Sequence, residues 1–71
     1  MRIQVNGEFR EVEAGTTVQE LVAILKLRSE RLAVELNNNV VRRADWEATI
    51  LHEGGKVEIV HFVGGGFNAN C

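Results

Sequence analysis

The sequence predicts a small α+β domain in which a mixed sheet packs on one helix. Residues 1–5 alternate in polarity and end in an Asn-Gly turn. Residues 18–26 repeat apolar side chains with a helical period, and residues 57–62 form an apolar final strand. A chain of 71 residues has room for one modest core, so we expect function on a surface, a loop or a terminus.

The N-terminal residues predict a β-hairpin. Met1, Ile3 and Val5 alternate with polar residues, which indicates a strand with one buried face. Asn6-Gly7 favours a two-residue turn, because both central positions of such a turn need a positive φ. We therefore expect a second strand over residues 8–13, although Phe9 and Val12 then fall on opposite faces.

One amphipathic helix is predicted over residues 18–26. Thr17 and Glu20 have the spacing of a capping box, in which each side chain bonds the other residue's backbone N–H. Lys26 suits the negative end of the helix dipole. The apolar stripe at i, i+3, i+4 and i+7 consists of Val18, Leu21, Val22 and Leu25.

The second half of the chain is predicted to alternate short strands and turns. The expected elements are strands over residues 32–36, 40–41, 49–51 and 57–62, turns over 37–39 and 53–56, and one helical turn over 45–47 with Asp45 as its cap. The first and last strands should lie side by side and run parallel.

The C-terminal residues have a different character. Gly64-Gly65-Gly66 has no side chains to pack, and residues 67–71 show no period. We expect a folded domain over residues 1–63 and a flexible tail over residues 64–71, with the three glycines and a five-residue extension.

Composition excludes several classes of function. The net charge is −2 with scattered basic residues, which argues against nucleic-acid binding. No apolar run approaches 18 residues, and residues 1–5 do not resemble a secretory signal. Cys71 is the only cysteine, and His52 and His61 lack neighbouring ligands, so we expect no disulfide and no metal site. A cytoplasmic monomer is the resulting expectation.

A docking patch is predicted on the last strand. Val57 and Ile59 account for its core face, so period two places Val60 and Phe62 on the other face, near Ala33 if the third strand is adjacent. An uncovered apolar patch suggests a partner surface. The alternative is that the segments between residues 40 and 51 cover it.

Five other positions have a simple structural interpretation beside a functional one. Trp46 is expected in the core, and Arg42 and Arg43 in solvent. His61 is expected at the surface rather than as a base. Cys71 is either a residue of a discarded tail or a redox handle that carries sulfur as a persulfide.

This order of elements resembles the β-grasp fold, and several stretches resemble the ThiS family of sulfur carriers. The resemblance spans residues 1–66 and rests on Asn6-Gly7, Gly15-Thr16-Thr17-Val18, Val34-Glu35-Leu36-Asn37, Arg43-Ala44-Asp45-Trp46 and, above all, Val57 to Gly66. The Arg-x-x-Trp turn favours the thiamine branch over the related molybdopterin-synthase subunit.

The resemblance implies a protein cosubstrate with no catalytic side chain and no bound cofactor. An ATP-dependent, ThiF-like activating enzyme would adenylate the terminal glycine, sulfur would replace the adenylate, and a ThiG-like thiazole synthase would accept it. The sulfur-carrying residues would be Gly66 with Gly65 and Gly64. Glycine suits a narrow enzyme channel because it has no Cβ.

The five residues after Gly66 depart from the family pattern. While Phe67 is attached, Gly66 has no free carboxylate, so Gly66–Phe67 is a predicted processing site for a peptidase. The alternatives are a carrier for molybdopterin or a sulfur amino acid, a ubiquitin-like modifier joined through Gly66, and a β-grasp binding module without covalent chemistry.

Overall fold

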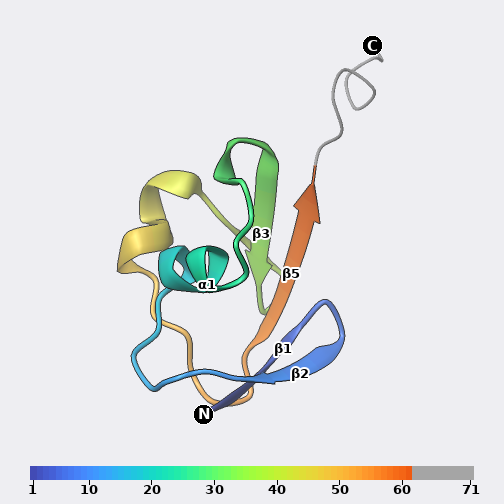
Figure 1. The fold of residues 1–71 in the computed structure, drawn as a ribbon, viewed down its shortest axis with the longest axis vertical. Coiled ribbons are helices and arrows are strands. Elements are labelled where there is room, and N and C mark those ends of the chain that lie inside the picture. The colour runs from blue at the N-terminus through green and yellow to red at the C-terminus, as the bar shows by residue number, and fades with distance from the viewer. Residues whose placement is uncertain (62–71) are drawn as a thin grey trace.

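The computed structural model of the chain describes residues 1–61, which form one five-stranded mixed sheet and its covering helices (Figure 1). The sheet order is β2-β1-β5-β3-β4, with β1 and β5 parallel and the other neighbours antiparallel. The elements are β1 (Arg2–Val5), β2 (Glu8–Glu11), α1 (Val18–Ile24), η1 (Ser29–Arg31), β3 (Leu32–Leu36), β4 (Asn39–Val41), η2 (Arg43–Ala48) and β5 (Lys56–His61). The predicted fold class is confirmed, as is the parallel pairing of the first and last strands.

The predicted hairpin joins β1 to β2. Asn6 has φ 51° and Gly7 has φ 84°, as the two-residue turn requires. The second strand ends at Glu11 rather than at residue 13. Its partner β1 begins at Arg2, and beyond that strand Met1 and Val12 bond to each other. The Val12 N–H donates to the Met1 carbonyl oxygen (2.9 Å), and the Met1 ammonium donates to the Val12 carbonyl oxygen (2.7 Å).

The capping box of α1 is formed as predicted. The Glu20 N–H donates to Thr17 Oγ1 (3.1 Å), and the Thr17 N–H donates to Glu20 Oε1 (3.0 Å). The helix ends at Ile24, two residues before the predicted end, because Lys26 takes φ 58°. The Lys26 and Leu27 N–H groups then bond to Ala23 and Val22 carbonyl oxygens, which is a Schellman ending.

The core lies between the sheet and a layer formed by α1 and η2 (Figure 1). Trp46 from η2 is 1% exposed, and its Nε1–H donates to the Val41 carbonyl oxygen (3.0 Å), so its predicted core position is confirmed. The buried apolar residues are Ile3, Val18, Leu21, Val22, Leu32, Val34, Trp46, Leu51, Val57 and Ile59.

Two further local predictions were wrong. The predicted strand over residues 49–51 is one isolated bridge between Thr17 and Ile50, because the chain opposite it enters α1 at Val18. The predicted cap Asp45 lies inside the first turn of η2, whose N-cap is Arg42. Among residues 1–61, no helix is long and apolar enough to cross a membrane.

Candidate functional site

The structure describes the strand that leads to the predicted site. Gly64, Gly65 and Gly66, the docking residue Phe62, the processing residue Phe67 and Cys71 lie outside the described residues, as does the predicted domain boundary. The last described residue, His61, is five residues before Gly66 along the chain. β5 is therefore the described element that lies nearest to the predicted site along the chain.

β5 has more paired residues on one edge than on the other. On one edge, β3 pairs with it from Leu36↔Val57 to Leu32↔His61. On the other edge, the pairing with β1 consists of Gln4↔Lys56 and Val5↔Val57. Within the described residues, the second half of β5 thus has a strand partner on the β3 edge alone.

A side chain replaces the missing strand on the β1 edge. The Ile59 N–H donates to Asn6 Oδ1 (2.7 Å), and Asn6 Nδ2 donates to the Ile59 carbonyl oxygen (3.2 Å). Sequence reasoning identified Asn6 as a turn residue and missed this contact, since nothing in a hairpin motif shows which strand its side chain reaches.

Val60 lies on the face of the sheet that is opposite the core, which no segment within residues 1–61 covers. It is 53% exposed and pairs with the half-buried Ala33 of β3, as predicted. The segments between residues 40 and 51 do not cover it, since η2 and Leu51 pack on the core face and Val40 is itself 69% exposed. The apolar patch therefore exists at Val60 and Ala33.

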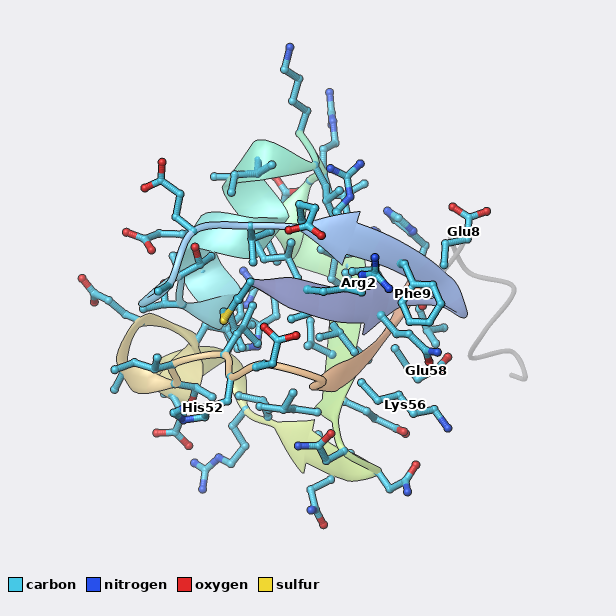
Figure 2. The ribbon with its side chains drawn as sticks, turned by 90° about the horizontal axis from the view of Figure 1, so that it is seen from below. Arg2, Glu8, Phe9, His52, Lys56 and Glu58 are labelled. Atoms are coloured by element: carbon cyan, nitrogen blue, oxygen red, sulfur yellow. The ribbon has the colours of Figure 1, made fainter. Side chains whose placement is uncertain are left out.

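Charged side chains share this face with Val60. Figure 2 shows Arg2, Phe9, Lys56 and Glu58 on the side of the sheet away from α1. The Arg2 guanidinium lies 5.0 Å from the centroid of the Phe9 ring, a cation–π distance. Glu58 is the direct cross-strand partner of Glu35. The face combines a small apolar patch with two adjacent carboxylates.

A surface pocket lies at the end of β5. Its lining residues are Arg28, Glu30, Arg31 and His61. His61 is exposed, as predicted. Arg42 and Arg43 are also exposed, and the Arg43 guanidinium lies 5.2 Å from the Trp46 ring centroid. In residues 1–61, no three potential metal ligands gather, and every buried side-chain nitrogen or oxygen has a hydrogen-bond partner.

In residues 1–61, the sheet order and one α-helix, with a last strand that leads toward a glycine run in the sequence, define the class: a ubiquitin-like β-grasp domain. Within this class, the chain belongs to the ThiS family, whose model matches residues 3–66. The match extends from β1 to the third glycine and so spans both the sheet and the predicted site.

Solved and characterised relatives agree with this assignment. The crystal structure of a thiamine biosynthesis protein (ThiS) from Geobacter metallireducens superposes with a TM-score of 0.82 at 37% identity, covering 92% of this chain and 99% of that chain. The sulfur carrier protein ThiS of Bacillus subtilis is 34% identical, covering 90% of this chain and 98% of that protein.

A longer relative is also similar. The thiazole synthase of Magnetococcus marinus is 46% identical over 66 residues, covering 93% of this chain. The chain spans 20% of the length of that protein and of a second thiazole synthase, from Paramagnetospirillum magneticum. A stretch similar to this chain thus occurs within both of these longer thiazole synthases.

Proposed function

We propose that this protein carries sulfur for thiazole formation in thiamine biosynthesis, as a thiocarboxylate on Gly66. The observation that carries the proposal is the ThiS family match over residues 3–66, which ends on the third glycine. The names of the Bacillus subtilis and Geobacter metallireducens relatives support the same role.

The first chemical step is adenylation of Gly66. A carboxylate oxygen of Gly66 attacks the α-phosphorus of ATP on a ThiF-like activating enzyme, and pyrophosphate leaves. The product is an acyl adenylate. The activating enzyme supplies the catalytic groups and the nucleotide site, so this chain acts as a cosubstrate.

The second step replaces AMP with sulfur. The terminal sulfur of an enzyme persulfide attacks the acyl carbon, AMP leaves, and an acyl disulfide forms. A cysteine thiolate of the enzyme then attacks the other sulfur of that bond, which yields a protein disulfide and the Gly66 thiocarboxylate. A ThiG-like thiazole synthase accepts the sulfur, a partner supported by the thiazole synthases that contain a related domain.

The uncovered sheet face serves as the docking surface. Val60 and Ala33 provide apolar contact beside the strand that leads to the glycines, and Phe62 extends the same period. Fixing the backbone of each residue that enters the enzyme costs about 1–2 kcal/mol. Contact on the rigid sheet offsets that cost when the tail enters the enzyme.

Removal of residues 67–71 precedes the chemistry. While the Gly66–Phe67 peptide bond is intact, the Gly66 carbonyl belongs to an amide and offers no carboxylate to ATP. A peptidase that hydrolyses this bond generates the reactive end. Phe67 gives such a peptidase an apolar side chain to bind beyond the cut.

The test compares a chain that ends at Gly66 with the 71-residue chain. Each is incubated with an adenylating enzyme from the same organism, ATP and a sulfur donor, and its mass is followed. The shorter chain should gain AMP and then sulfur, and the longer chain should gain neither until it is cut. A chain that ends at Gly65 is the matched control.

Two results would contradict the proposal. The first is an unmodified chain ending at Gly66 under conditions in which the same enzyme modifies another ThiS protein. The second is protein from the native host that still retains Phe67 while thiazole is being made. Transfer of the sulfur to a molybdopterin precursor, but not to thiazole synthase, would show that the carrier serves a different pathway.

A further inference from the structure

The backbone bonds on the β1 edge of β5 follow every second residue. The Gln4 N–H donates to the Gly55 carbonyl oxygen (2.9 Å), and the Asn6 N–H donates to the Val57 carbonyl oxygen (2.8 Å). The next position in this series is Ile59. There β1 has ended, because Asn6 and Gly7 form the turn into β2.

The Asn6 carboxamide continues the series by one position. It accepts from the Ile59 N–H at 2.7 Å and donates to the Ile59 carbonyl oxygen at 3.2 Å, so it reproduces the donor and acceptor of a peptide group. The φ of 51° at Asn6 is one that asparagine tolerates better than most residues. The turn geometry and the hydrogen bonds to Ile59 therefore both favour asparagine at position 6.

This contact is placed where the strand leads to the reactive glycine. Ile59 adjoins Val60, the exposed residue of the docking face, and is seven residues before Gly66. Five residues span at most about 18 Å, which limits how far Gly66 can lie from His61. The direction of β5 at Ile59 thus sets where His61, the last described residue before the glycines, lies relative to a partner docked on Val60.

Resting on the proposed function, we infer that Asn6 is a positioning residue for the chemistry at Gly66. Its side chain holds the second half of β5 against the hairpin, so that the strand reaches His61, the last described residue, in one direction relative to the docking face. Loss of this clamp, the pair of hydrogen bonds between Asn6 and Ile59, lowers the rate of adenylation by the docked enzyme. Val60 and Ala33 remain paired and preserve docking.

The chain offers a matched control at the other end of β5. Asn37 also has a positive φ (52°), and its Oδ1 accepts from the Lys56 N–H at 2.9 Å while its own N–H donates to the Lys56 carbonyl oxygen (2.8 Å). Asn37 therefore holds the same strand far from the tail. Glycine tolerates a positive φ, so Asn6→Gly and Asn37→Gly each remove one clamp without backbone strain.

The experiment uses chains that end at Gly66, an adenylating enzyme from the same organism and saturating ATP. Asn6→Gly should speed exchange of the Ile59 amide proton about fivefold, the effect of one ordinary hydrogen bond. It should also lower kcat for adenylation about three- to tenfold with KM within about twofold. Asn37→Gly should keep kcat within about twofold of wild type. Asn6→Asp keeps only the acceptor of the pair, so its kcat should lie between those of Asn6→Gly and wild type.

An unchanged kcat in Asn6→Gly, or an equal loss in Asn37→Gly, would overturn the inference while leaving the proposed function intact. Failure of the wild-type chain itself to accept AMP would overturn the proposed function and this inference with it. If Asn6→Gly does not fold, Asn6→Asp decides: it keeps the bond from the Ile59 N–H and loses the bond to the Ile59 carbonyl oxygen, and a wild-type kcat in this variant rejects the positioning role.

Discussion

Glu35 on β3 and Glu58 on β5 are direct cross-strand neighbours on the uncovered face of the sheet. Like charges in this arrangement destabilise a sheet. The next cross-strand pair along the same face is Ala33 and the exposed Val60. In the proposed complex, these two carboxylates beside the apolar patch would be complemented by an arginine or a lysine on the enzyme.

Replacing one of these carboxylates should stabilise the isolated domain. Glu35→Lys turns a repulsive cross-strand pair into an attractive one, so the free energy of unfolding should rise by about 0.5 kcal/mol. Urea denaturation at low salt measures the change, and high salt should reduce it. Glu47→Lys, an exposed site on η2, is the control and should change little. A less stable Glu35→Lys variant would show that the pair is not repulsive.

Charge at Val60 should weaken docking on the adenylating enzyme. Val60→Lys, alone or with Phe62→Lys, places a cation in the apolar patch, and we expect about a tenfold or larger loss of affinity by calorimetric titration. Ile50→Lys is the matched control, because Ile50 is 48% exposed but lies beside the start of α1. Equal affinity of the folded Val60→Lys and wild-type proteins would remove the patch from the docking surface.

Truncation of Leu21 should be costly. The side chain is fully buried between α1 and the sheet, so Leu21→Ala should lower the free energy of unfolding by about 2–5 kcal/mol in chemical denaturation. Ile24 on the same helix is 50% exposed, and Ile24→Ala should cost less than about 1 kcal/mol. Similar losses at both positions would contradict the assignment of the buried helix face.

The capping box should contribute a measurable part of the stability. Thr17→Ala removes the acceptor for the Glu20 N–H at the first turn of α1 and should cost about 1 kcal/mol. Gln19→Ala, at an exposed position of the same turn, should be close to neutral. Equal effects from both substitutions would mean that the cap bond adds nothing beyond helix propensity.

Local patterns in the sequence predicted the elements with the strongest local physics. The Asn-Gly turn requires positive φ at two successive residues, and the Thr17–Glu20 box satisfies N–H groups within one helical turn, so both are visible in a few residues. Predictions failed where the outcome depended on distant chain. The bonds at residues 49–51 run to the chain around Thr17, a partner that no local pattern identifies.

The candidate site also combines features that neighbouring residues determine with contacts that distant residues determine. The sequence alone determined that an apolar strand precedes three glycines, because period two and the absence of side chains are properties of neighbouring residues. Tertiary structure decided which partners face that strand: Asn6 reaches Ile59 across 53 residues, and Glu35 meets Glu58 across the β3–β5 register. Such contacts follow from sheet order and register, which depend on how the strands pair with one another across the whole sheet rather than on any single segment.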